Sequence, residues 1–165
     1  MGVTTLSLMF LEIVCEFMRS EKVVLVQCTN SKRDGRHKAA DLYDESPYFR
    51  KQRRFARAVG DRWFIQSAKY GLVAPQNVVE SYNTHASDLS DSVAWARRIA
   101  ADLSNRVGRG EVILLGGTDY ADPLEPELSR RGFEVSLPLT GKGIGERMSW
   151  LDNRSEEVLN ATLHG

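Results

Sequence analysis

The chain has 165 residues, and its 22 Lys and Arg residues balance its 22 Asp and Glu residues. This length favours one domain that buries about 70% of its unfolded surface, so folding needs no disulfide or metal. A net charge of zero excludes a uniformly basic nucleic-acid coat, although a local basic face remains compatible with it. Two cysteines, Cys15 and Cys28, are too few for a disulfide framework or a four-ligand zinc site. We therefore expect a reduced, cytoplasmic setting, with Cys28 as a small buried apolar residue.

The first residues are apolar enough to raise the question of targeting. No Lys or Arg precedes Arg19, and Glu12 and Glu16 interrupt the apolar run, so it fits neither a secretory signal nor a membrane span. We expect residues 1–20 to be an extension or an extra helix, residues 21–165 to be an α/β domain, and no membrane to be involved.

The next part of the chain predicts two strands and a helix, separated by two long polar loops. The continuous apolar run Val23–Val26 is typical of a strand buried on both faces. Ser46 as the N-cap and Pro47 as the first helical residue begin a helix that ends at Gly60. In chain order the elements are the strand 23–26, the loop 29–45, the helix 47–59, the strand 63–65 and the loop 67–87.

The second half alternates helices and strands in the same way. Apolar residues at helical spacing run from about Ser90 to Val107, and Gly108 ends the pattern. The predicted elements are the helix 90–107, the strand 112–115, a short helix 123–131, the strand 133–137 and the helix 143–164.

Alternating strands and helices predict a single-domain three-layer α/β sandwich with a mainly parallel sheet of about four strands. In such sheets ligands bind beyond the carboxyl ends of the strands. We therefore expect four loops to meet at one rim: residues 29–45, 68–87, 116–122 and 138–143.

The first of these loops carries groups that suit an anion. Asn30, Ser31 and Lys32 directly follow the first strand, where backbone amides, a hydroxyl and an ammonium group can hold a phosphate, with Arg33 beside them. The Asn30 amide can alternatively orient a water molecule. Residues 32–62 hold ten basic and five acidic residues, a net charge of +5, which suits a polyanion.

The second loop combines several chemical types. Ser67 and Lys69 follow the second strand, and this lysine can hold an anion or act as a nucleophile if its pKa falls. Glu80 and Tyr82 add a carboxylate and a phenol. His85 is predicted to be a surface residue, because no second histidine lies at ligand spacing.

The last two loops contain paired and clustered glycines. Gly116 and Gly117 let the backbone approach a ligand closely, with Asp119 behind them as a candidate acid or base and Tyr120 as a stacking ring. Lys142 lies in a glycine-rich turn that opens the last helix, where free amides favour an anion.

Four segments of the chain together resemble a known group of domains. They read LVQC-TNSK, AADLYDESPYFRKQRRFA, DRWFIQSAKYGLVAP and LPLTGKGIGERMSWL. They resemble bacterial, archaeal and phage domains with C-x-x-S/K-K, LY-x-S-x-F and SAK-x-GL motifs. Those domains are allied to YaaA-type proteins and to the uracil-DNA-glycosylase-like fold. The similarity covers residues 23–151, and it departs from the group where a PYD-like triplet reads Ser81-Tyr82-Asn83.

This resemblance implies chemistry on a base–sugar bond. It implies a cytoplasmic DNA glycosylase without metal or cofactor, which hydrolyses the N-glycosidic bond of a modified base and leaves an abasic site. The occurrence of similar domains in phages and defence settings implies a phage-type hypermodified pyrimidine and a role in antiviral defence. DNA is the implied partner, and no obligatory protein partner is evident.

Roles follow for the candidate residues. Asn30, Lys69, Asp119 and Glu80 are the catalytic candidates, and Asn30 matches a water-positioning amide of one glycosylase branch. A base could stack on Tyr43, Tyr70, Tyr82 or Tyr120. DNA phosphates would contact Ser31, Lys32, Arg33, Ser67 and Lys142.

Two other functions fit the same residues. A nucleoside hydrolase or base-exchange transglycosylase would turn over mononucleosides and would have little use for the basic segment 32–62. A non-enzymatic DNA-binding stress protein would show salt-dependent affinity without a product.

Overall fold

The structure is a computed structural model that describes residues 5–18 and 20–165. Its middle layer is a five-stranded sheet in the order β4-β3-β1-β6-β7, parallel except for β4. This confirms the α/β class and the mainly parallel sheet, with one strand more than expected. The strands are β1 (Glu21–Gln27), β3 (Arg62–Ser67), β4 (Gly71–Val73), β6 (Gly110–Leu114) and β7 (Glu134–Ser136).

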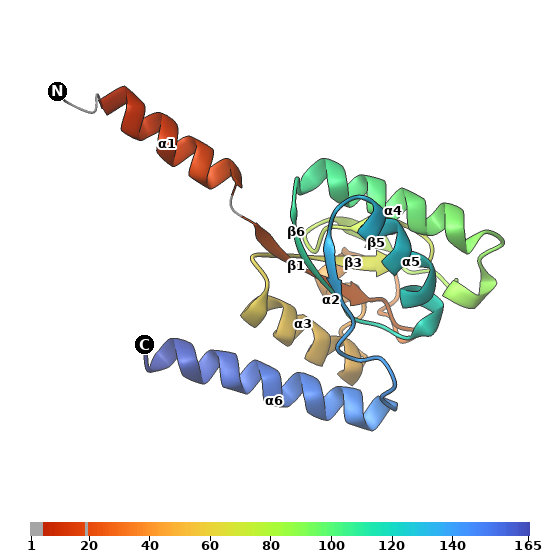
Figure 1. Cartoon of the computed structure of the whole chain (residues 1–165). Helices are drawn as coiled ribbons and strands as arrows, with labels where there is room; N and C mark the ends of the chain where they lie inside the picture. The colour runs from red at the N-terminus through yellow and green to blue at the C-terminus, as the bar shows by residue number, and fades with distance from the viewer. Residues whose placement is uncertain (1–4, 19) are drawn as a thin grey trace.

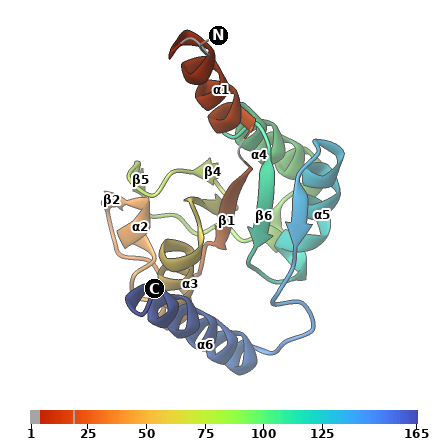
Figure 2. The same ribbon diagram turned by 60° about the vertical axis from the view of Figure 1, so that its left-hand side comes forward.

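Helices cover both faces of this sheet (Figure 1). Helices α3 and α6 pack together on one face, and α4 and α5 pack together on the other, as Figure 2 also shows. β1 lies between them with Val23–Val26 fully buried, as the apolar run predicts. The helices are α3 (Pro47–Val59), α4 (Ser92–Arg106), α5 (Thr118–Arg130) and α6 (Ile144–Leu163).

The strand order creates a reversal beside β1. The chain leaves β1 through α3 to reach β3 on one side, and it returns over the opposite face through α4 to reach β6 on the other side. The carboxyl ends of β1 and β6 therefore lie where the connections diverge, which is the usual ligand position in open α/β sheets.

The two long polar loops contain structure that their sequences did not indicate. β2 (Arg36–Lys38) and β5 (Val78–Glu80) pair antiparallel and join the two loops into a separate small sheet. α2 (Ala39–Leu42) and the short 3₁₀ helix η1 (Ala86–Asp88) lie in the same loops. Elements of three or four residues are too short to show a hydrophobic period, so the pattern missed them.

Helix α5 starts earlier than predicted. Pro123 suggested a helix start, because proline is favoured in the first turn, but the helix begins at Thr118 and includes Pro123 and Pro126. Its buried residues Tyr120, Leu124 and Leu128 recur every fourth position. The earlier start brings Asp119 and Tyr120 into the first turn.

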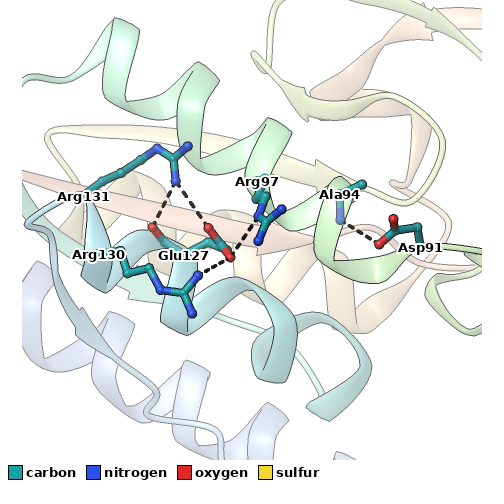
Figure 3. A network of polar contacts seen from close by, with 6 residues as sticks. All are labelled: Asp91, Ala94, Arg97, Glu127, Arg130 and Arg131. Atoms are coloured by element: carbon teal, nitrogen blue, oxygen red, sulfur yellow. Dashed lines mark hydrogen bonds and ion pairs between the residues drawn. The ribbon is translucent and has the colours of Figure 1, made fainter.

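A buried carboxylate fastens α5 to α4 (Figure 3). Glu127 is 5% exposed, and its Oε1 accepts hydrogen bonds from Arg130 (2.7 Å) and from Arg97 of α4 (3.4 Å). Arg131 contacts its Oε2 at 3.5 Å. Asp91 caps the start of α4 by accepting the Ala94 N–H at 2.9 Å. These contacts fix α4 and α5 relative to each other on one face of the sheet.

Helix α1 (Thr5–Met18) extends away from the sheet in both views. Its apolar side chains stay in contact with solvent, including Leu6, Phe10 and Ile13, and no described helix is long and apolar enough to cross a membrane. Met1–Thr4 and Arg19, which belong to the predicted extension, lie outside the described residues.

A chain that begins at Ser20 is therefore expected to keep its stability. Removing α1 exposes little new core surface, so the melting temperature should change by less than about 2 °C. Thermal unfolding followed by circular dichroism measures this. Loss of the cooperative transition would show that the first residues belong to the domain.

Candidate functional site

A polar pocket of about 370 Å³ lies at the carboxyl ends of β1 and β6. It occupies the point where the strand connections diverge, so the fold itself predicts this location. Five segments line it: residues 27–31 at the end of β1, Ser46 and Tyr48 at the start of α3, 85–87 at η1, Asp119 and Tyr120 of α5, and Ile144 and Arg147 of α6.

Three helices point their N-terminal ends at this pocket. The pocket is lined by the first turns of α3, α5 and α6. The N-caps of α5 and α6 are Gly117 and Gly143, which have no side chain to satisfy the first amides. Free amides and the helix dipole favour negative charge at such ends.

Arg147 adds a full positive charge. Its Nε donates to the Lys142 carbonyl at 2.8 Å, and one guanidinium nitrogen lies 3.4 Å from where a Cβ on Gly117 would stand. The side chain is therefore tied between α6 and the start of α5. Together with the helix ends, it makes this part of the pocket electropositive.

Gly116 and Gly117, which we expected to let the backbone approach a ligand, lie against the side chain of Gln27. Gly116 has φ +148°, and a Cβ there would stand 3.1 Å from Gln27 Oε1. That oxygen accepts the Gly117 N–H at 2.9 Å. Here the close approach is made by the Gln27 side chain, which joins the ends of β1 and β6.

Two buried glutamines lie beneath the joined ends of β1 and β6. Neither was predicted as a site residue. Gln52 of α3 is fully buried, its Oε1 accepting the Gln27 N–H at 2.9 Å and its Nε2 donating to the Gln27 carbonyl at 3.4 Å. Gln66 of β3 is also fully buried and donates to the carbonyl oxygens of Leu25 and Leu115. The available signal was a glutamine in the otherwise apolar stripe of α3.

Four predicted site residues meet in the pocket: Asn30, Ser31, Asp119 and Tyr120. Asn30 and Asp119 are exposed side chains at its rim. Asp119 is the carboxylate and His85 the imidazole among the described lining residues, so these two side chains can carry acid–base chemistry here. The Asn30 amide can orient a water molecule in the pocket, and the Asp119 carboxylate can take a proton from it.

Other predicted residues lie outside this pocket. Lys69 and Glu80 have exposed side chains that do not line the pocket. The backbone carbonyl of Glu80 accepts a hydrogen bond from the Tyr70 hydroxyl at 3.0 Å. Arg33 pairs with Asp44 at 2.9 Å instead of facing a ligand. The structure thus separates Lys69 and Glu80 from Asn30 and Asp119.

Ser67 and Lys142 also depart from the predicted phosphate contacts. Ser67 is fully buried, and its hydroxyl lies 2.7 Å from the Tyr82 hydroxyl while accepting the Tyr70 N–H at 3.1 Å. Lys142 contributes its carbonyl to Arg147, and its side chain is not among those lining the pocket. A buried, hydrogen-bonded serine is not available to a phosphate.

Two of the predicted stacking tyrosines belong to the core. Tyr43 is 1% exposed, and Tyr120 is 7% exposed although it lines the pocket, so little of either ring is available for stacking on a base. The Tyr120 hydroxyl lies 3.1 Å from the sulfur of Cys28, which is buried as predicted. Burial raises the pKa values of both phenols, so both stay protonated at neutral pH.

The lining residues that were not predicted as site residues include Tyr48, His85 and Arg147. His85 is half-buried instead of a surface residue, and its backbone N–H donates to the Asp88 carboxylate at 3.0 Å. Burial raises the pKa of Tyr48, while the neighbouring Arg147 guanidinium opposes that rise. Tyr48 and Arg147 lie in segments that carry the family resemblance, but no motif singled out either side chain.

Comparison with known proteins places the chain in a family. Residues 23–153 match the model described as "Family of unknown function (DUF6884)". The chain belongs to this family. The DUF6884 match includes every residue that lines the pocket and leaves out α1.

The DUF6884 chain also has a curated relative. "Uncharacterized protein YfjM" of Bacillus subtilis (strain 168) is 28% identical over 124 residues, which cover 73% of this chain and 81% of YfjM. No solved structure matches the chain.

In this DUF6884 chain an acidic residue fastens the loop that leads into α3. Asp44 contacts Arg33 at 2.9 Å and Arg53 at 2.6 Å. Burial alone would raise the pKa of Asp44, but hydrogen bonds and charges from Arg53 and Arg33 lower it below its usual value. The carboxylate therefore stabilises the fold at pH values above the pKa it has when unfolded, about 3.9.

Asp44→Asn should make the free energy of unfolding depend less steeply on pH in the acidic range. The native chain loses this contribution as pH falls through the lowered pKa. The variant lacks the contribution, about 1 kcal/mol, at pH 7, so the two stabilities converge as pH falls through that pKa. Urea unfolding at several pH values measures the difference. The control Asp41→Asn removes a longer 4.0 Å contact to Arg53, and an equal effect there would contradict a special role for Asp44.

Proposed function

We propose that this chain is a DNA glycosylase that hydrolyses the N-glycosidic bond of a modified base, with a phage-type hypermodified pyrimidine as the substrate class and antiviral defence as the role. Kinship with YaaA-type proteins and with the uracil-DNA-glycosylase-like fold is part of this proposal. Its support from the coordinates is the arrangement of one pocket. Asn30 and Asp119, 89 positions apart in the sequence, line that pocket together.

The pocket has the chemical parts that base release needs. The reaction develops positive charge on the sugar and negative charge on the departing base. Asp119 at the rim is suited to the water and the sugar, whereas Arg147 and the first turns of α5 and α6 are suited to the base or a phosphate. One cavity thus holds both a negative and a positive side chain, as these needs require.

The proposed step consumes one water molecule. Asn30 orients the water, and Asp119 accepts its proton while the oxygen bonds to C1′ of the sugar. The C1′–N bond breaks and its electron pair leaves with the base, which takes up a proton. The products are the free base and an abasic sugar with a hydroxyl at C1′, and the phosphodiester backbone stays intact.

Incubation with DNA tests the proposal directly. DNA carrying hypermodified pyrimidines and matched unmodified DNA are each incubated with the protein, and abasic sites are detected with an aldehyde-reactive probe. Abasic sites in modified DNA only are the expected result. Their absence from every modified DNA would overturn the proposal, and salt-dependent binding without product would indicate a binding protein instead.

A nucleoside hydrolase or base-exchange enzyme is the second candidate, and one observation favours it. The basic residues of α3 are partly neutralised, because Lys51 pairs with Asp152 and Arg53 pairs with Asp44. This reduces the positive potential available to a polyanion. Release of free base from mononucleosides at rates similar to those with DNA would favour this candidate.

A further inference from the structure

Two lysines from different loops gather around one tyrosine ring outside the pocket. Lys32 follows β1, and its Nζ lies 4.4 Å from the centre of the Tyr82 ring. Lys69 follows β3, and its Nζ lies 6.0 Å from the same centre and 5.2 Å from that of Tyr70. We call these two ammonium groups and the Tyr82 ring the lysine pair.

The positive charge of this pair is not balanced locally. Among the described residues, neither Lys32 nor Lys69 has a carboxylate oxygen within 4.0 Å, although most arginines of α3 and α5 do. Lys32 is half-buried, and loss of water lowers its pKa. Two ammonium groups within 6.0 Å of one ring centre, one of them partly desolvated, favour an anion near them.

The ring beneath the lysines is fixed. The Tyr82 hydroxyl lies 2.7 Å from the Tyr43 hydroxyl and 2.7 Å from Ser67 Oγ, and its ring meets Tyr70 edge-on at 5.3 Å. Burial raises the pKa of Tyr82, so the phenol stays neutral and does not itself pair with the lysines. The pair is therefore a preformed surface, not two free side chains.

The lysine pair adjoins the pocket through Asn30. Lys32 Nζ donates to the Asn30 carbonyl at 3.4 Å, and Asn30 lines the pocket. A ligand in the pocket that continued past Asn30 would reach this positive charge. A single nucleoside carries no phosphate to meet this charge, whereas a nucleic-acid strand carries one at every nucleotide.

We propose that Lys32 and Lys69 form a backbone-phosphate subsite, and that the substrate is consequently a nucleic-acid strand and not a free nucleoside. This inference rests on the proposed function, because it assumes that a nucleotide occupies the pocket. It would also supply positive charge for a polyanion in addition to the basic residues of α3, which are partly neutralised.

The salt dependence of binding tests the subsite without any need for catalysis. A fluorescent unmodified single-stranded oligonucleotide is titrated with the native chain, Lys32→Ala, Lys69→Ala and the double variant at several salt concentrations. Each lost phosphate contact should lower the slope of log K against log salt by about 0.7, so the double variant should lose about 1.4. Lys22→Ala removes the same charge at the opposite end of β1 and should leave the slope unchanged.

Each outcome has a separate meaning. A double variant with the native slope would overturn the subsite, since the lysines would then only cover the tyrosine ring. Replacing both by arginine should restore the slope, which excludes misfolding as the cause of a loss. A lowered slope in a protein that forms no abasic sites would retain the subsite and reject the glycosylase, whereas base release with an unchanged slope would do the reverse.

Discussion

Asp119→Asn is expected to lower the rate of base release by about 10²–10⁴-fold while DNA binding stays within about threefold of the native value. Asp119 is the carboxylate among the described residues that line the pocket, and asparagine keeps its shape but cannot take a proton from water. Single-turnover release of base from modified DNA measures the rate, and fluorescence anisotropy measures binding in parallel.

Asp122→Asn is the matched control for this experiment. Asp122 is an exposed carboxylate one turn further along α5 and does not line the pocket. The same change there should leave the rate within about twofold. If the two variants lost activity equally, the effect would arise from the charge of α5, and Asp119 would have no role as a base.

Gln52→Ala is expected to cost about 3 kcal/mol in the free energy of unfolding. The change leaves a cavity beneath the end of β1 and removes the partner of the buried Gln27 N–H, and these costs add. Urea unfolding gives the free energy. Because Gln27 also holds Gly117, the variant should bind ligands in the pocket more weakly even where it remains folded.

Arg54→Ala is the comparison on the same helix. Arg54 is exposed, and its contact with Asp152 is 4.0 Å, so its loss should change the free energy of unfolding by less than about 0.5 kcal/mol. A Gln52 variant as stable as this one would show that the amide contacts of Gln52 contribute little.

Local sequence patterns were sufficient to predict the layers of the fold. The run Val23–Val26 indicated the central strand, and Ser46 with Pro47 marked the start of α3, because both signals lie within a few consecutive residues. Knowing that ligands bind at strand ends also placed Asn30 and Asp119 in one pocket. These predictions needed only nearest-neighbour chemistry and one topological rule.

The remaining site residues depend on strand order, which the sequence does not reveal. The connections diverge between β1 and β6, not between β1 and β3. The pocket therefore forms beside Asp119, which follows β6, while Lys69, which follows β3, lies outside it. Arg147 becomes a lining residue only because α6 crosses back to pack on α3. Tyr43 and Tyr120 looked available for stacking because a tyrosine in a loop gives no sign of whether its ring is buried.

The return of α6 to the face of α3 makes the pocket a late product of protein synthesis. The wall that carries Ile144 and Arg147 is absent until α6 docks, even when the sheet and the other helices have already formed. Ligand affinity and the docking of α6 are therefore thermodynamically linked, and a ligand bound in the pocket should oppose the detachment of this helix.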